Sequence, residues 1–178
     1  PDGRIVAVHS GNKCASGTGE FFLQQIRRMD MSLEEAISRA ERGTPHRIAG
    51  RCSVFCKSDC THALNKGEPR ENITAGLCTM MADKISDLVK DIPSSRVAIT
   101  GGGSLNSALV GILSKRFPRV DVLPSSSVFE AFGAALWAVS NPCMPLPETL
   151  EDVFRNVGHS FGYHPPLKSA LDLVEFRP

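Results

Sequence analysis

The spacing of the apolar residues changes on either side of Pro93, and this change limits the folds open to the chain. From about Asn72 to Asp91 apolar residues recur every three or four positions, which predicts one long helix that ends before Pro93. Residues 97–100 instead form a short continuous run, and three glycines follow at once. Such a run predicts a buried strand, and strands that alternate with helices indicate a parallel sheet.

The second half of the sequence continues this alternation. We expect Ser104 to cap a helix that runs to Phe117, residues 120–123 to form a second strand, and Ser127 to open a last helix. The last helix has small residues at 133–135, which suit close packing on a sheet. This order predicts an α/β fold with parallel strands.

The first half is predicted to be mostly helical. An apolar run between Arg4 and His9 indicates a short strand, and a run of mostly small residues leads from it into a helix. A capping box at Ser32 predicts a second helix that stops near Gly43, and a third is expected over residues 53–66.

These elements suggest how the chain is divided. We expect residues 1–140 to form one domain with a mostly helical insertion at about 20–92. Residues 141–178 are rich in proline, and we expect them to be a connector or a C-terminal extension. The chain starts at Pro1 and opens directly into structure, which we interpret as a fragment of a larger chain.

Composition excludes several classes of function. The 178 residues carry a formal net charge of +1 and no basic stripe, so we expect no nucleic-acid partner. No apolar run is long enough to cross a bilayer, and no signal peptide precedes the first strand. We therefore expect no membrane partner and a cytoplasmic location.

Two glycine-rich turns are candidate ligand sites. Gly17, Thr18 and Gly19 precede a helix start, where glycines let backbone N–H groups approach a phosphate. The tripeptide is also compatible with a simple turn, and it lacks the Lys-Ser/Thr of a P-loop. The glycines at 101–103 lie at the carboxyl end of a predicted parallel strand, where α/β sheets bind ligands. Bare backbone there suits a purine or ribose, although a tight strand-to-helix turn also explains it.

Six cysteines suggest metal or redox chemistry, because a reducing compartment disfavours disulfides. Cys14 and Cys52 lie near predicted helix starts, where the partial positive charge favours thiolates and an anionic cluster. Two thiolates are too few for a four-iron cluster, and a two-fold dimer would supply the other pair.

The other cysteines have simpler interpretations. Cys56 and Cys60 follow Cys52 at steps of four residues, so they lie along one helix face. They are candidates either for a metal site or for packing against another helix. Cys78 and Cys143 are interpreted as small buried apolar residues.

Four segments together resemble the BadF/BadG/BcrA/BcrD ATPase family. Residues 12–19 and the Phe-Phe-Leu that follows resemble its signature, and residues 51–65 resemble its second cysteine segment. Residues 97–106 are similar to its adenosine-side motif, and residues 129–136 to its closing helix. The family includes activators of 2-hydroxyacyl-CoA dehydratases and ATPase subunits of benzoyl-CoA reductase.

The resemblance implies a fold and a set of ligands. The chain would form the second lobe of an actin-like, ribonuclease H-like ATPase. Its cofactors would be ATP, magnesium and a 4Fe–4S cluster that bridges a homodimer or a pair of homologous subunits, with Cys14 and Cys52 as each subunit's ligands. ATP hydrolysis would help to drive an electron onto a reductase or dehydratase partner. The implied nucleotide-binding residues are Gly17, Thr18, Gly19, Gly101, Gly102, Gly103 and Asn106.

The sequence departs from the family pattern in two respects. The family's first phosphate loop belongs upstream and is absent here, so the catalytic residues stay unknown and the isolated fragment is expected to be inactive. Cys56 and Cys60 are not ligands in the activator pattern, which leaves room for a variant metal site.

Two other functions compete with an ATPase activator. A non-catalytic dimerisation or cluster-holding module would need the cysteines but not the glycine turns. A small-molecule kinase of the same fold would need the glycine turns but not the cysteines. Both features are present, which favours an ATP-hydrolysing activator.

Overall fold

The computed structural model describes residues 5, 7–10, 17–92, 96–142, 145, 148–149 and 151. Contacts within the chain divide it into two units, Pro1–Ser140 and Asn141–Pro178. The helices and strands of the first unit are α1 (Gly19–Arg28), α2 (Leu33–Arg42), α3 (Ser53–Asn65), α4 (Arg70–Val89), β1 (Val97–Ile99), η2 (Gly102–Leu105), α5 (Ser107–Ser114), β2 (Val120–Val122), η3 (Ser126–Val128) and α6 (Phe129–Ser140).

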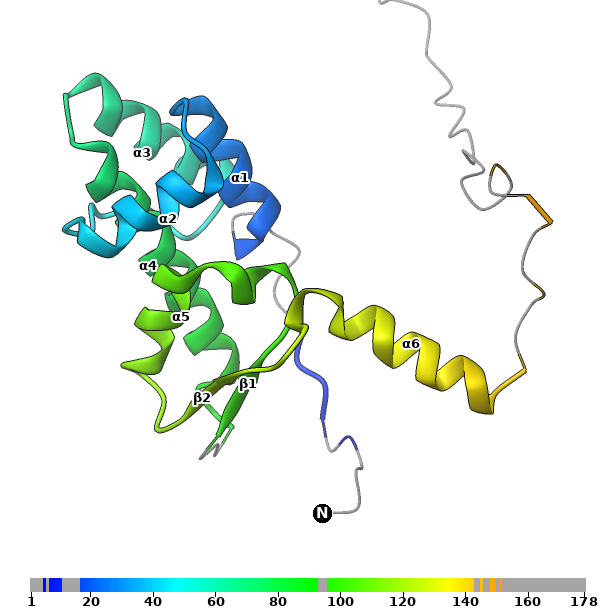
Figure 1. Ribbon diagram of the computed structural model, residues 1–178. Coiled ribbons are helices and arrows are strands. Elements are labelled where there is room, and N and C mark those ends of the chain that lie inside the picture. Colours follow the sequence, from blue (N-terminus) through cyan, green and yellow to red (C-terminus); the bar gives the residue numbers. More distant parts are fainter. Residues whose placement is uncertain are drawn as a thin grey trace, which may run out of the picture. The chain divides into compact units, whose positions relative to one another are not determined.

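The longest helix, α4, organises the core of the first unit. Helices α2, α3 and α5 all contact it (Figure 1), and its residues 73–78 and 80–82 are buried. Ile73 and Leu77 have no exposed surface, and they belong to a core to which α1, α2, α3 and α5 also contribute. The helical period from residue 72 onward therefore marks the face on which the unit is built.

A segment between α2 and α3, residues 44–50, crosses α4 at close range. The N–H of His46 donates a hydrogen bond to the carbonyl of Asn72 at 2.9 Å. A β-carbon on Gly76 would lie only 2.1 Å from the His46 carbonyl oxygen, and one on Gly43 would lie 2.1 Å from that of Glu71. Glycine at these two positions is what allows the crossing.

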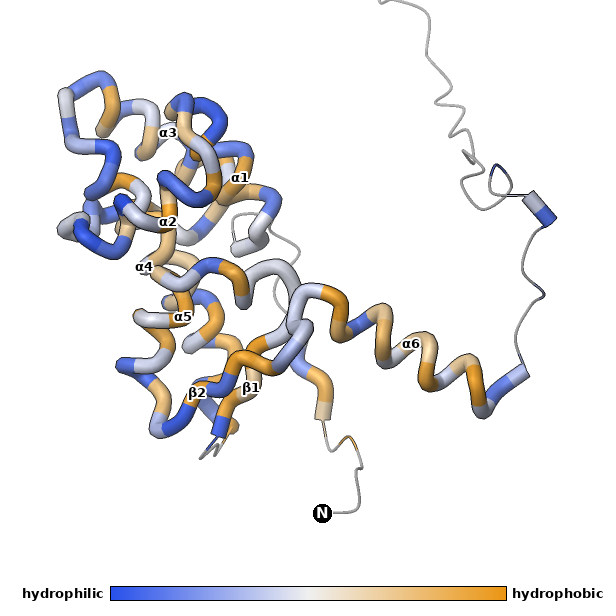
Figure 2. The backbone as a smooth tube through the Cα atoms, in the orientation of Figure 1, coloured by the Kyte–Doolittle hydropathy of each residue, from blue (hydrophilic) through white to orange (hydrophobic). Residues whose placement is uncertain are grey.

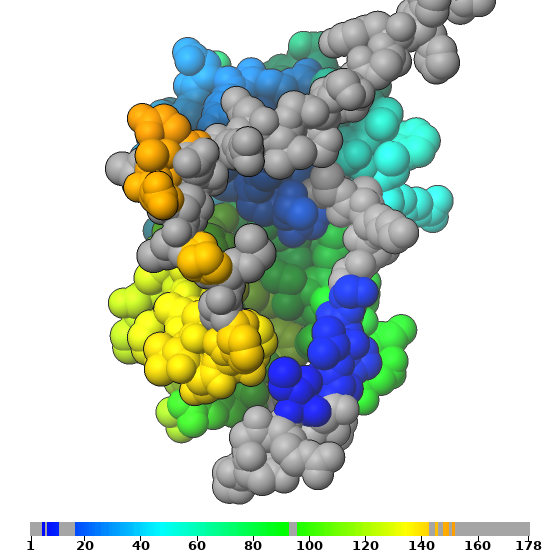
Figure 3. All heavy atoms as spheres, turned by 90° about the vertical axis from the view of Figure 1, so that its right-hand side faces the viewer, coloured from blue at the N-terminus to red at the C-terminus, as the bar shows by residue number. Residues whose placement is uncertain are grey.

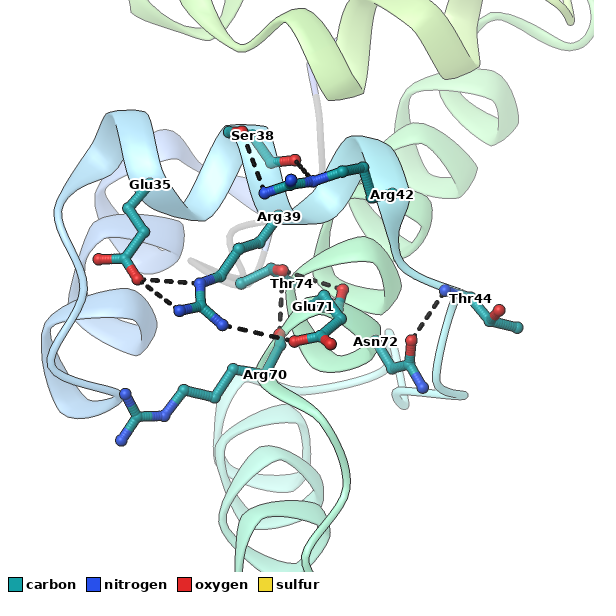
Figure 4. A network of polar contacts seen from close by, with 9 residues as sticks. All are labelled: Glu35, Ser38, Arg39, Arg42, Thr44, Arg70, Glu71, Asn72 and Thr74. Carbon is teal, nitrogen blue, oxygen red and sulfur yellow. Dashed lines mark hydrogen bonds and ion pairs between the residues drawn. The ribbon is translucent and has the colours of Figure 1, made fainter.

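Polar contacts join α2 to α4 beside the crossing segment, as Figure 4 shows. Arg39 contacts Glu35 one turn earlier in α2 at 2.8 Å and Glu71 of α4 at 3.5 Å. The side-chain oxygen of Asn72 accepts the N–H of Thr44 at 2.8 Å. The side chains of Arg39, Glu35 and Glu71 are about 40% exposed. Ion pairs this exposed add little to the free energy of unfolding, so these contacts mainly orient the two helices.

The two strands pair in parallel, as the sequence predicts. Val97 lies opposite Val120 and Ile99 opposite Val122, and α5 forms the crossover between the strands. Asp121 of β2 accepts hydrogen bonds from Arg96 and Arg119. The hydrogen bond from Arg96, with smaller contributions from Arg119, lowers the pKa of Asp121. The carboxylate is therefore engaged by two arginines on the sheet.

The helices predicted in the first half are present. The Ser32 side chain accepts the N–H of Glu35 and caps α2, which is followed by Gly43. Helix α3 ends at Asn65, and Gly67 after it has φ +80°, a backbone conformation that favours glycine. Helix α4 begins at Arg70, two residues before the predicted start.

The cap of α5 differs from the prediction. Asn106, not Ser104, caps this helix, and its side-chain oxygen accepts the N–H of Leu109 at 3.0 Å. Ser104 lies inside the short turn η2, where its hydroxyl donates to the Gly101 carbonyl at 2.6 Å. The prediction failed because η2 inserts one extra tight turn between the glycines and the helix.

Two further segments differ from the sequence-based expectations. No strand is assigned at Ile5 or at residues 7–10, the described part of the predicted first strand, and Ile5 and Val8 are each 83% exposed. A strand needs a hydrogen-bonded neighbour. A last helix forms, but α6 begins at Phe129 and not at the predicted Ser127, which lies in the short turn η3. None of the described residues of α6 is buried, so it lacks the predicted close packing on the sheet. Figure 2 shows apolar residues along its length, and Figure 3 shows it at the surface in yellow.

Among the described residues, no helix is both long enough and apolar enough to cross a membrane.

Candidate functional site

The two glycine turns, about eighty residues apart in the sequence, line the same cavity. Its volume is about 410 Å³, within the range of small-molecule sites. Gly19 and Glu20 at the start of α1 form one wall, and Gly102, Gly103 and Asn106 after β1 form another. Four of the seven predicted nucleotide-binding residues line this cavity, namely Gly19, Gly102, Gly103 and Asn106. The other three, Gly17, Thr18 and Gly101, are not among its lining residues.

The remaining walls of the cavity are apolar. Among its described lining residues only Glu20 carries a charge, and that carboxylate also accepts a hydrogen bond from Gln24 at 3.3 Å. The apolar side chains come from α1, α2, α4 and η2: Phe22, Leu23, Leu33, Ile37, Met81 and Leu105. A flat, weakly polar ring fits such walls better than a phosphate does.

The turn after β1 presents bare backbone to this cavity. Gly101 has φ +79°, and a β-carbon there would lie 3.0 Å from a carboxylate oxygen of Glu130. Gly101 is therefore required for the shape of the turn. A β-carbon on Gly102 or Gly103 would meet nothing within 4 Å. These two positions leave open space where a ligand can approach the chain.

Asn106 is held from two sides beneath the turn. Its oxygen caps α5, and its amide nitrogen donates to the Cys78 sulfur of α4 at 3.6 Å. Burial raises the pKa of Cys78 to about 11, and the Asn106 hydrogen bond acts in the opposite direction. Cys78 is therefore a protonated, buried thiol at neutral pH, and its contact links α4 to the cavity wall.

The first glycine turn forms the start of α1. The Thr18 hydroxyl oxygen accepts the N–H of Phe21 at 3.2 Å and caps the helix. The first-turn N–H groups of an α-helix have no carbonyl partner within the helix, so they are available to an anion. A β-carbon on Gly17 would lie 3.0 Å from Cδ of Lys84. Lys84 of α4 was not predicted as a site residue, because nothing near it in the sequence marks it.

Cys52 differs from the other cysteines that the structure describes. It is the N-cap residue of α3, it is partly exposed, and no acidic residue follows it in the first turn. Cys56, Cys60 and Cys78 are buried. Cys14 and Cys143 lie outside the described residues. The predicted pairing of Cys14 with Cys52 therefore stays a prediction.

Cys56 and Cys60 contact each other inside the helical core. The hydrogen bond with Cys56, and then burial, raise the pKa of the Cys60 thiol far above its usual range, while Arg28 acts to lower it. Among the described residues no group of three or more His, Cys, Asp or Glu side chains is arranged to hold a metal ion. The positions of Cys56 and Cys60 agree with their interpretation as packing residues.

Comparisons with known proteins identify a family to which the sequence is similar. Residues 1–138 match the model of the BadF/BadG/BcrA/BcrD ATPase family. The 2-hydroxyisocaproyl-CoA dehydratase activator of Clostridioides difficile is 32% identical over 141 residues, which are 77% of this chain and 53% of that protein. The activator of lactoyl-CoA dehydratase of Anaerotignum propionicum is 31% identical over 142 residues, or 76% of this chain and 54% of the relative.

The fold is also similar to a solved structure. The activator of the 2-hydroxyisocaproyl-CoA dehydratase from Clostridium difficile, with bound ADPNP, superposes with a TM-score of 0.70 and 27% identity. The likeness covers 80% of this chain and 57% of that one. It confirms the actin-like fold that the sequence predicted. The chain spans about half the length of the curated relatives it matches.

Proposed function

This chain belongs to the BadF/BadG/BcrA/BcrD ATPase family, and we propose that it is part of an ATP-hydrolysing activator of a CoA-ester dehydratase or reductase. The cavity between the two glycine turns would take the adenosine of ATP. The protein would deliver electrons to its partner enzyme through an iron–sulfur cluster. Relatives named as activators of CoA-ester dehydratases support this role.

The shared cavity is the observation that carries the proposal. Its apolar side chains suit the adenine ring, and the open space at Gly102 and Gly103 lets a ribose approach the backbone. The start of α1 at Gly19 lies on the opposite wall, where its N–H groups would meet phosphates. Gly17 and Thr18 would extend this phosphate side. A solved structure of a relative with bound ADPNP agrees with a nucleotide in this fold.

Asn106 is proposed to act on the nucleotide chiefly through the shape of the cavity. Both ends of its side-chain amide are already engaged, by α5 and by Cys78. It would therefore hold the end of the glycine turn in place, since its own N–H donates to the Gly103 carbonyl at 3.2 Å. A magnesium ion would accompany the phosphates.

Cys52 fits the proposed cluster because it is a partly exposed residue at a helix start. Cys14 and Cys52 would hold a 4Fe–4S cluster together with the same pair from a second subunit. When bound, such a cluster carries one electron at a time. The positive end of α3 and the absence of an acidic residue in its first turn suit the negative charge of a cluster. The buried Cys56, Cys60 and Cys78 would serve as packing residues in the core.

The proposal is tested with anaerobically reconstituted full-length protein. We expect one four-iron cluster per dimer, measured as iron and acid-labile sulfide together with the visible spectrum. Cys14→Ser and Cys52→Ser should abolish it, whereas the matched control Cys78→Ser should retain it. Full iron content in both the Cys14 and Cys52 variants would refute the ligand assignment. Calorimetric titration with Mg-ATP tests the nucleotide separately, and binding without any cluster would favour a kinase of the same fold.

A further inference from the structure

One lysine, Lys84, lies between the first glycine turn and the segment that leads to Cys52. The Lys84 side chain leaves α4 between Gly17 of the first glycine turn and Gly50 of the crossing segment. Its Cδ lies 3.0 Å from where a β-carbon on Gly17 would be, and its Cε lies 3.7 Å from the same point on Gly50. A β-carbon on Gly17 would therefore be crowded by the lysine stem, whereas one on Gly50 would lie at an ordinary van der Waals distance from it.

The Gly50 end of this contact is fixed to the helices. The N–H of Ala49 donates to the carboxylate of Asp59 on α3 at 2.8 Å, and Ile48 beside it is buried. Gly50 itself rests on Met80, one turn before Lys84 in α4, with its β-carbon position 3.4 Å from Cγ. Because Cys52 is only two residues from Gly50, a displacement of Gly50 would also displace Cys52.

The Gly17 end of the contact adjoins the nucleotide side. Gly17 directly precedes Thr18, which caps α1. The next residue, Gly19, lines the cavity. Phosphates bound at the start of α1 would change the backbone or its freedom at this point. The Lys84 stem lies beside the β-carbon positions of both Gly17 and Gly50.

Packing, and not charge, holds Lys84 in this place. Within the residues that the structure describes, neither an ion pair nor a hydrogen bond involves its ammonium group. Its side chain is half-buried. The unbranched stem is therefore the part of Lys84 that matters for the contact with the two glycines.

We propose that Lys84 is a positioning residue that couples the first glycine turn to the segment carrying Cys52, so that the nucleotide state alters the surroundings of the Cys52 thiol. This inference rests on the proposed function, because it needs a nucleotide at the glycine turn. Lys84 transmits the change through its alkyl stem and does not itself touch the nucleotide.

The test measures the chemical reactivity of Cys52 in the full-length protein, free of iron and under reducing conditions. Alkylation by iodoacetamide is followed peptide by peptide in a mass spectrometer, with either Mg-ADP or Mg-AMPPNP present. For the wild type we expect the two rates at Cys52 to differ by about fivefold or more, the scale of a typical coupling between sites. Calorimetry measures the affinity for each nucleotide in the same samples.

Three variants separate the stem from the charge. Lys84→Met keeps an unbranched stem and should keep the rate difference, whereas Lys84→Ala removes the stem and should abolish it. Lys90→Ala, which removes an exposed lysine after the end of the same helix, should behave as the wild type. Alanine favours helix, so Lys84→Ala is expected to fold. Nucleotide affinity should change by no more than about twofold in any variant, which is a small energy.

The outcomes are distinguishable. An unaltered rate difference in Lys84→Ala, or no difference in a wild type that binds both nucleotides, would overturn the role of Lys84 and leave the proposed ATPase function standing. A wild type that binds no nucleotide in calorimetry would remove the proposed function and the coupling together. Loss of the difference in Lys84→Met would assign the effect to the charge and so contradict the stem mechanism.

Discussion

Single glycines determine where chain segments and ligands come close in this protein. Gly76 lies in the middle of α4, where a glycine normally weakens a helix, yet the crossing segment passes directly over it. Gly102 lies at the cavity and has open space beside it. The same residue type therefore serves packing at one position and, as we propose, ligand binding at the other.

Gly76→Ala should destabilise the protein although alanine is the better helix former. The added methyl group would lie 2.1 Å from the His46 carbonyl oxygen, so the crossing segment would have to move. We expect the free energy of unfolding to fall by about 1–3 kcal/mol, the usual cost of overpacking. Urea denaturation followed by circular dichroism measures the change.

Gly111 provides the matched control for Gly76. It is an exposed helical glycine of α5, and a β-carbon there would meet nothing within 4 Å. Gly111→Ala should raise the free energy of unfolding by up to about 1 kcal/mol through helix propensity alone. Equal effects of the two substitutions would contradict the close approach at Gly76.

Gly102→Val should leave the fold intact and weaken ATP binding. The valine side chain enters open space in the free protein, but it would fill the place proposed for adenosine. The expected loss is about 1–3 kcal/mol, by analogy with steric misfit in a packed site. Isothermal titration of the full-length protein with Mg-ATP measures it, and Gly111→Val adds the same side chain away from the cavity as a control. Unchanged affinity in a folded Gly102→Val protein would mean that adenosine binds elsewhere.

Capping residues and apolar helix faces explain most of the secondary structure. Helices α5 and α6 are the exceptions. The cap of α5 moved from Ser104 to Asn106 because η2 lies between the glycines and the helix. Helix α6 has the apolar face of a packed helix, yet Trp137 is 61% and Phe132 is 58% exposed. Helical period predicts that a face is apolar, but it does not supply the surface that covers the face.

Asn106→Ala should destabilise α5 and loosen its tie to α4. The substitution removes a helix cap and the hydrogen bond to Cys78. Loss of the cap alone costs about 0.5–2 kcal/mol. Asn106→Asp keeps the capping oxygen but loses the donor to Cys78, so its stability should lie between those of the wild type and the alanine variant. Thermal unfolding measured by calorimetry ranks the three, and a fully stable Asn106→Ala protein would contradict the cap.

On the scale of the whole molecule, the described residues provide walls of the proposed nucleotide cavity but little of the chemistry of phosphoryl transfer. Glu20 is the one carboxylate among the described residues that line the cavity, and Asp121 is engaged by Arg96 and Arg119 on the sheet. Transfer of a phosphoryl group needs carboxylates that hold magnesium and orient the attacking water.

We therefore predict that the 178-residue chain binds ATP weakly and hydrolyses it at a negligible rate. Phosphate release under saturating Mg-ATP is the measurement, with a full-length family member assayed side by side as the positive control. Turnover by the 178-residue chain at the rate of that control would show that the catalytic groups lie within the chain after all.

The sequence by itself determined the elements whose signals are local. Apolar period, capping at Ser32 and the glycines after α3 and β1 act within a few residues, and so the helices and the parallel strands could be predicted. The family could be predicted as well, because its motifs are short and keep their order along the chain.

Only the tertiary structure decided which distant residues meet. Gly19 and Gly102 line one cavity, a segment crosses over Gly76, and Lys84 lies beside Gly17 and Gly50. All three arrangements depend on how α2, α3 and α5 pack on α4 and how α1 packs on α2 and α3. Burial separated Cys52 from Cys56 and Cys60, although all three share one stretch of sequence. Packing brings together residues that are far apart in the chain, and a pattern read over a few neighbouring positions carries no information about such contacts.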